Sequence, residues 1–171
     1  MKAKSAEKQL DGFIGKYSPE VAALARAALA RMRARLPRAV ELVYDNYNAL
    51  AIGFGPNERT SEAIFSIALW PRWVSLFFLQ GAGLPDPDRL LRGSGKVVRH
   101  IVLEEAEDLD KPAVERLIAS ALARARTPLE GTGAGRIVIK SVSAKQRPRR
   151  PAQEGPAERP SRKRRPEGKT P

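Results

Sequence analysis

Residues 63–79, AIFSIALWPRWVSLFFL, decide the fold of this chain. Two apolar runs rich in aromatic and β-branched residues flank Pro71 and Arg72, a pattern typical of two antiparallel strands joined by a tight turn. The alternative is a membrane-spanning helix, which would place a proline and a charged side chain near the bilayer centre at a high cost in free energy. The stretch therefore predicts a hairpin of two strands, over 63–70 and 73–79, that are apolar on both faces and lie inside a sheet.

Helical and strand patterns continue on both sides of this hairpin. The spacing of apolar residues, broken by prolines and glycines, predicts helices over 6–17, 19–36 and 110–125 and strands over 50–54 and 97–103. Their order predicts an α+β fold, in which two N-terminal helices and one closing helix pack on one face of a mostly antiparallel, four-stranded sheet. Residues 136–142, RIVIKSV, are either a fifth strand at the sheet edge or part of a loop.

Composition and charge divide the chain into parts. None of the 171 residues is cysteine and only one is histidine, which excludes thiolate catalysis, iron–sulfur clusters and zinc sites built on Cys or several His. The net charge is +12, and residues 131–171, with 12 Lys and Arg against 3 acidic residues, supply nine of those charges. We expect a domain over 1–130, a glycine linker with the edge strand over 131–142, and a disordered, basic, proline-rich tail over 143–171.

The tail contains two dense groups of cations. Such groups can bind the phosphate backbone of nucleic acid without reading its sequence, and the candidates are Arg147, Arg149, Arg150, Arg162, Lys163, Arg164 and Arg165. A tail that only keeps the protein in solution is the alternative. No aromatic residue is interleaved with these cations, so base stacking is not expected of the tail itself.

Several motifs of the body follow one another in an order that resembles a known family. A tyrosine-rich junction over 41–48 precedes the aromatic hairpin, and a Gly-Ser-Gly-Lys turn over 93–96 leads into a basic strand and the closing helix. Over residues 10–125 this order resembles the YdhG-like domain family, whose function is largely unknown and whose fold is similar to that of the frataxin-type iron chaperones. The resemblance implies that iron or another divalent cation is the candidate cofactor.

An acidic stretch before the closing helix is the candidate metal site. Its carboxylates come from Glu104, Glu105, Glu107 and Asp108, and oxygen ligands of this kind suit iron(II), Mg²⁺ or Ca²⁺. The alternative is that they complement the positive end of the helix dipole and contact solvent. The spacing matches no EF-hand loop.

Aromatic and basic residues of the predicted sheet form the candidate site for a small ligand. The residues singled out are Tyr44, Tyr47, Trp73, Lys96 and Arg99. Aromatic rings can line an apolar pocket and the two cations can attract an anion, whereas the alternative is that the rings belong to the core. Trp73 follows the hairpin turn, and we expect it to be exposed.

Two motifs suggest chemistry that we reject. Gly93-Ser-Gly-Lys96 is followed by a strand rather than by Ser or Thr and a helix, so it is a turn and not a phosphate-binding loop. His100 alternates with valines and is expected to be a packed histidine; an enzyme acting on a small anion through Lys96, Arg99 and His100 is the weakest interpretation. The sequence predicts a non-enzymatic, cytoplasmic module without membrane contact that binds a small ligand or a metal ion. The alternative is a nucleic-acid-associated protein that uses the tail.

Overall fold

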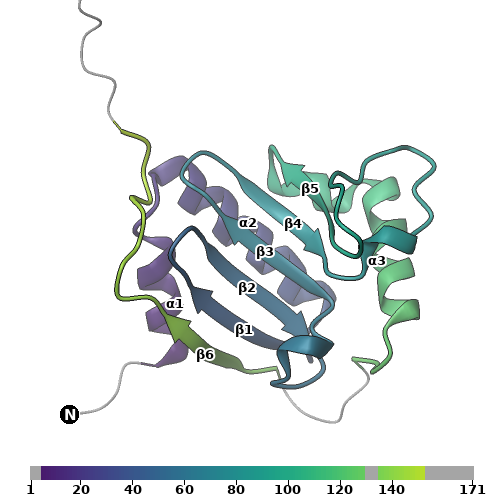
Figure 1. Cartoon of the computed structure of the whole chain (residues 1–171), viewed down its shortest axis with the longest axis horizontal. Helices are drawn as coiled ribbons and strands as arrows, with labels where there is room; N and C mark the ends of the chain where they lie inside the picture. Colours follow the sequence, from purple (N-terminus) through teal and green to yellow (C-terminus); the bar gives the residue numbers. More distant parts are fainter. Residues whose placement is uncertain (1–4, 130–134, 153–171) are drawn as a thin grey trace, which may run out of the picture.

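Six strands form one mixed sheet in the part of the chain that the computed structural model describes, residues 5–129 and 135–152 (Figure 1). The strands are β1 Val40–Asp45, β2 Leu50–Gly55, β3 Phe65–Leu69, β4 Val74–Phe78, β5 Arg99–Leu103 and β6 Ile137–Val142. The helices are α1 Ala6–Ile14, α2 Pro19–Arg35 and α3 Pro112–Arg124, with the short 3₁₀ helices η1 Thr60–Glu62, η2 Gly81–Gly83 and η3 Ala106–Asp110. The predicted α+β class and its three helices are confirmed.

The sheet is larger than the sequence predicts. Its strand order is β5-β4-β3-β2-β1-β6, antiparallel throughout except that β6 runs parallel to β1. The prediction of four strands is wrong because β1 was interpreted as a junction. The edge strand left open over 136–142 is present as β6. The hairpin of 63–79 is confirmed, and its strands β3 and β4 lie inside the sheet.

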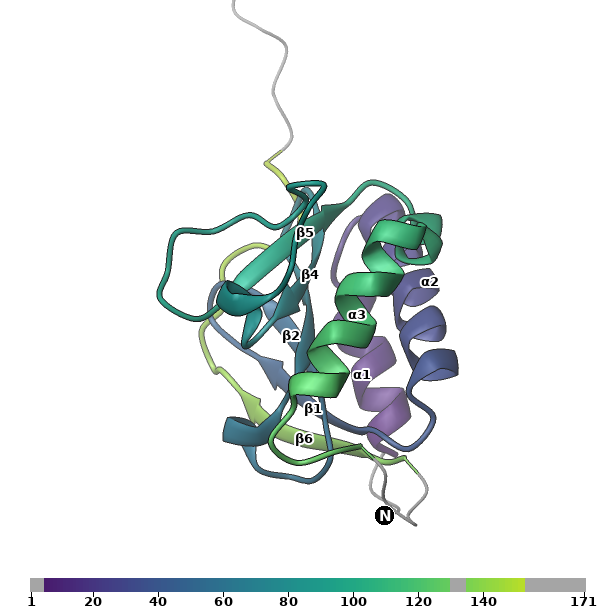
Figure 2. The ribbon, with the colours of Figure 1, turned by 90° about the vertical axis from the view of Figure 1, so that its right-hand side faces the viewer.

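The three α-helices cover one face of the sheet, and within residues 5–129 and 135–152 no α-helix lies on the opposite face. Figure 2 shows the helices on one side, with η1 and the loop between β4 and β5 on the other. On the helix side, the register brings together a row of buried apolar residues, one from each of five strands, which are Val43, Ile52, Ile67, Leu76 and Ile101. These residues belong to one core cluster with the apolar stripe of α2, which includes Ala25, Leu29 and Met32.

Local sequence signals explain where the first two helices begin. The side chains of Ser5 and Ser18 accept hydrogen bonds from the backbone N–H groups of Lys8 and Val21, and Pro19 occupies the first turn of α2. Between the helices, Tyr17 is buried, and its hydroxyl donates to the carbonyl of Leu69 at 2.9 Å. That hydroxyl also accepts from the N–H of Leu50 at 3.0 Å, so it links the end of α1 to two strands of the sheet.

One segment that was predicted to be disordered is part of the fold. Residues 143–152, which we call the C-terminal strap, follow β6 and contain the buried side chain of Arg149. The prediction of a disordered tail is therefore wrong for these ten residues, while 153–171 lie outside the described residues. No helix in 5–129 or 135–152 has the length and apolar character needed to span a membrane.

Candidate functional site

A row of four aromatic rings lies on the face of the sheet opposite the helices, which we call the open face. The ring of Trp73 stacks on that of Trp70 at 5.6 Å between centroids, and Trp70 contacts Phe77 at 5.8 Å. Phe77 in turn stacks on His100 at 5.0 Å. This aromatic row therefore crosses from the β3–β4 turn to β5; three of its members lie within residues 70–77, and His100 comes from a later strand.

The register of the strands explains why these rings meet. Phe77 pairs with Ser66 on one side and with His100 on the other, so the side chains of all three point to the same face. The central strands present mostly small residues there, among them Gly53, Ser66 and Ala68, so large rings can lie across the sheet. Ser75 stands between Trp73 and Phe77 along β4 and is only 1% exposed, which indicates that the rings cover it.

The exposed end of the row coincides with one end of the sheet. Trp73 is 44% exposed, and Tyr47, in the turn between β1 and β2, is 50% exposed. Both turns lie at the same end because Asp45, Leu50, Leu69 and Val74 are register partners across four strands. Two large aromatic side chains are therefore accessible to solvent at one end of the sheet.

Three cations lie in the β3–β4 turn and the β4–β5 loop, the segments that adjoin the aromatic row. Arg72 is exposed in the β3–β4 turn, Arg92 pairs through its backbone with His100, and Lys96 is exposed in the β4–β5 loop. None of these three side chains forms an ion pair with another described residue. Burial first, and then the nearby charge of Arg92, lower the pKa of His100 below its ordinary value of 6.5. The imidazole that stacks on Phe77 therefore takes up a proton less readily than a free histidine does.

The C-terminal strap brings further cations to this end of the sheet. The backbone N–H of Arg147 donates to the carbonyl of Tyr47 at 2.8 Å, and its guanidinium carbon lies 5.6 Å from the centre of the Tyr47 ring. The sequence of the tail contains no aromatic residue, and base stacking was therefore not expected of the tail itself. The fold supplies one instead, because it places a basic residue of the strap directly over an aromatic residue of the body.

The predicted ligand-binding residues are only partly brought together. Tyr44, Tyr47 and Trp73 belong to the hairpin end of the open face or to the strand leading to it, with the Tyr44 hydroxyl hydrogen-bonded to Thr60. Arg99 does not join them. It is the register partner of Phe78, on the helix side, and its guanidinium donates to the carbonyls of Gly95 and Val98 within its own loop. Lys96 is exposed in that loop.

The sequence did not identify the full aromatic row. Of its four members, only Trp73 was among the candidate ligand-binding residues, and His100 was expected to be a packed histidine. The alternation of His100 with the neighbouring valines correctly indicated the face on which it lies, together with Val102. The signal that was missing is the pairing of β4 with β5, which is needed to place His100 beside Phe77.

The acidic stretch is not arranged as a metal site. Within 5–129 and 135–152, no three Asp, Glu or His side chains converge on a point where they could hold a metal ion. The carboxylate of Asp108 accepts from the backbone N–H of Glu104 at 2.8 Å and of Glu105 at 3.2 Å, and it pairs with Lys111 at 2.7 Å. Glu107 pairs with Arg31 on α2. These residues do not fit the iron site that the resemblance implies.

The local role of Asp108 is to fix the start of η3. Burial raises the pKa of its carboxyl, but the hydrogen bonds from Lys111, Glu104 and Glu105 outweigh that effect and lower the pKa below the ordinary value. A carboxylate that accepts backbone N–H groups in this way is a capping residue. The alternative interpretation of the acidic stretch, in which it serves the start of a helix, agrees with this geometry.

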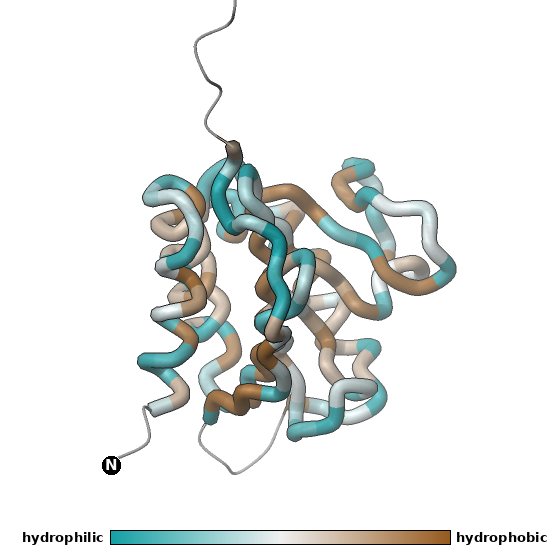
Figure 3. Tube along the Cα trace, turned by 60° about the vertical axis from the view of Figure 1, so that its left-hand side comes forward, coloured by the Kyte–Doolittle hydropathy of each residue, from teal (hydrophilic) through white to brown (hydrophobic). Residues whose placement is uncertain are grey.

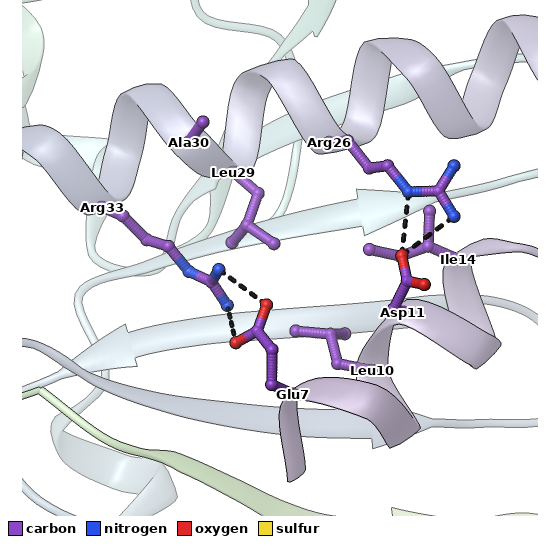
Figure 4. A pocket seen from close by; sticks show the side chains of 8 residues that line it. All are labelled: Glu7, Leu10, Asp11, Ile14, Arg26, Leu29, Ala30 and Arg33. Carbon is purple, nitrogen blue, oxygen red and sulfur yellow. Dashed lines mark hydrogen bonds and ion pairs between the residues drawn. The ribbon is translucent and has the colours of Figure 1, made fainter. Parts of the chain in front are cut away.

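Two hollows lie away from the open face. The first, of about 440 Å³, lies between α1 and α2, where Glu7 pairs with Arg33 and Asp11 with Arg26, each at 3.0 Å (Figure 4). Its charged side chains already satisfy one another across the apolar floor formed by Leu10 and its neighbours. The second, of about 420 Å³, lies between the segment before β3 and the end of α3. Neither hollow is lined by a residue of the aromatic row.

The cations proposed for nucleic acid differ in their surroundings. Arg147 and Arg150 are exposed, whereas Arg149 is buried against Asp45 at 2.9 Å. Arg162, Lys163, Arg164 and Arg165 lie outside the described residues. Comparison of the chain with protein-family models, with curated proteins and with solved structures finds no match, so the resemblance to the YdhG-like family stays a prediction.

Proposed function

We propose that this protein binds single-stranded nucleic acid, without catalysis, across the open face of its sheet. Bases stack on the exposed aromatic rings at the hairpin end, and phosphates pair with the surrounding cations. The observation that carries the proposal is the position of Arg147 over the ring of Tyr47, because it joins the basic strap to the aromatic end of the sheet. A cytoplasmic location is part of the proposal.

The shape of the site favours an extended ligand over a compact one. Small molecules are usually bound in concave pockets that enclose most of their surface. The aromatic row contributes to neither of the two hollows, and Trp73 and Tyr47 are about half exposed. A flexible strand with a planar base at each nucleotide can follow such a surface. Arg72 and Lys96, which form no ion pair with another described residue, suit its phosphates.

Single strands are favoured over duplexes by the same surface. Stacking requires bases whose faces are accessible, and a duplex hides them between its own base pairs. The three α-helices of the described residues pack against the sheet on the side away from the aromatic row, so none of them is placed to enter a major groove from that face. The proposal therefore modifies the earlier alternative, in which the tail alone bound the phosphate backbone.

The test is the affinity of the full chain for fluorescently labelled oligothymidylate and oligouridylate, measured by anisotropy over a salt series. We expect binding that weakens with salt, together with quenching of tryptophan fluorescence. Trp73→Ala should weaken binding about tenfold or more, since stacking contributes about 1–3 kcal/mol for each base. Val142→Ala is the matched control, because Val142 is also exposed and apolar but lies on β6.

The outcomes separate the alternatives. Equal affinity of Trp73→Ala and the unchanged protein would exclude the open face as the binding surface, even if the tail still binds. Tight binding of a mononucleotide, with no gain for longer oligonucleotides, would favour the small-ligand site predicted from the sequence. Absence of binding to every oligonucleotide at low salt would overturn the proposal.

A further inference from the structure

The C-terminal strap is held to a small part of the body. Its backbone N–H groups at Ser143 and Arg147 donate to the carbonyls of Asp45 and Tyr47, each at 2.8 Å. The side-chain amide of Gln146 donates to the carbonyl of Asp45 at 3.1 Å and accepts from Lys16 at the same distance. The strap therefore joins the end of α1 to the turn between β1 and β2.

Its composition is unlike that of the strand before it. β6 begins with the apolar run Ile137-Val-Ile139, whereas the ten residues of the strap include four Lys or Arg and no acidic residue. Figure 3 shows the change as a tube that is brown at the start of β6 and mostly teal along the strap. A segment with so little apolar surface needs a specific attachment to stay on the body.

Arg149 provides that attachment. Its side chain is 4% exposed, and its guanidinium donates to the carboxylate of Asp45, which is fully buried, and to the carbonyl of Asn46. The same guanidinium lies 5.7 Å from the centre of the Tyr17 ring. The next residue, Arg150, is exposed, and its guanidinium donates to the carbonyl of Lys16, so two adjacent arginines have opposite environments.

We infer that the Arg149–Asp45 pair anchors the C-terminal strap beside the exposed aromatic rings, so that the strap and the open face bind one nucleic-acid strand together. This inference rests on the proposed function. Anchoring keeps Arg147 at a fixed place over Tyr47 and Arg150 against the carbonyl of Lys16. Once a strand contacts the face, its contact with the strap is intramolecular and has a high effective concentration.

The first experiment compares two neighbouring substitutions that remove the same charge. In the full chain, Arg150→Ala deletes an exposed cation and Arg149→Ala deletes the anchor. For an oligothymidylate of about 16 nucleotides, Arg149→Ala should lower the affinity at least about tenfold more than Arg150→Ala. For one of about 4 nucleotides, which covers only the open face, the two variants should bind alike.

The second experiment tests, in the absence of nucleic acid, whether Arg149 holds the strap to the body. Hydrogen exchange of the full chain, followed by mass spectrometry, should show protection of the amides of Ser143 and Arg147. That protection should be lost in Arg149→Ala and retained in Arg150→Ala. If Arg149→Ala does not fold, Arg149→Met replaces it; this variant fills much of the buried space but removes the nitrogen that donates to Asp45 and Asn46, so strap protection should fall while the core stays protected.

Each result decides one part of the inference. Unchanged exchange of the strap in the Arg149 variants would overturn the anchor whether or not the protein binds nucleic acid. Loss of protection combined with equal effects of Arg149→Ala and Arg150→Ala on the longer oligonucleotide would overturn the joint surface. If the unchanged protein binds no oligonucleotide, the proposed function fails and the exchange result still decides the anchor.

Discussion

The guanidinium of Arg149 lies 2.9 Å from the carboxylate of Asp45, although the two residues are 104 positions apart in the sequence. Neither side chain is more than 4% exposed. Asp45 also pairs with Lys16 at 2.8 Å, so one buried carboxylate holds the end of a helix, the end of a strand and the strap. Removing one partner of a buried ion pair lowers the free energy of unfolding much more than removing an ion pair at the surface.

We therefore expect Asp45→Asn to lower the free energy of unfolding by about 3 kcal/mol or more, because it leaves the buried guanidinium of Arg149 without a counter-charge. The measurement is unfolding in urea followed by circular dichroism. Asp11→Asn is the matched control, since Asp11 pairs with Arg26 at 3.0 Å on the surface, and its loss should cost about 0.5 kcal/mol. Equal losses in the two variants would show that the buried pair contributes no more to the free energy of unfolding than the surface pair does.

Tyr17→Phe tests the hydroxyl that links α1 to the sheet. The substitution leaves the N–H of Leu50 and the carbonyl of Leu69 without their side-chain partner in a buried position. We expect a loss of about 1–3 kcal/mol in the free energy of unfolding, measured by denaturant titration. Tyr47→Phe removes a hydroxyl from an exposed ring and should stay within about 0.5 kcal/mol; a comparable loss there would contradict the assignment.

The single histidine gives the stability a defined pH dependence. Because the pKa of His100 is lowered in the folded protein, the unfolded state binds a proton first as the pH falls below 6.5. The free energy of unfolding should therefore decrease as the pH falls through this window, and the decrease should be absent in His100→Gln. Proton NMR titration of the imidazole gives the folded pKa directly, and a value above 6.5 would contradict the burial of the ring against Phe77 and the nearby charge of Arg92.

Asp108 should act through capping and not through a metal ion. Its lowered pKa means that its stabilising effect is complete above the ordinary value of 3.8 and is lost as the pH falls through the lower folded value. At neutral pH, Asp108→Ala should lower the free energy of unfolding by about 1 kcal/mol, because it removes the side chain that accepts from the N–H groups of Glu104 and Glu105. Added Mg²⁺ or Fe²⁺ should change the melting temperature of neither protein; a metal-dependent rise that needs Asp108 would restore the metal site predicted from the sequence.

The sequence predicted the elements whose apolar pattern is regular and missed the one whose pattern is interrupted. In β1, the positions that face the helices are Glu41, Val43 and Asp45, so two of three are acidic. Nothing nearby in the sequence suggests that such carboxylates are buried. Glu41 is accommodated because Arg33 donates to both of its oxygens, at 2.8 and 2.9 Å. A strand of this kind becomes recognisable only when its distant partners are placed.

The candidate site, too, was predictable where its signals are local in the sequence and was missed where its contacts join distant residues. Tyr47 and Trp73 could be expected at turns, because the turn signals stand next to them in the sequence. The contact of Phe77 with His100 depends on strand register, and the burial of Arg149 depends on a carboxylate in the first half of the chain. Composition correctly identified the strap as basic, but it could not reveal that one of the four cations is used as an internal attachment.

The parallel pairing of β6 with β1 also has a consequence for protein synthesis. The first strand of the sheet is translated long before the strand that covers its outer edge, and Arg149 follows later still. A nascent chain that has already formed its three helices and the other five strands still exposes the backbone of β1, and the Asp45 carboxylate has only Lys16 as a partner. Ribosomal products that stop before Arg149 should therefore be recognised by proteases more readily than the finished chain.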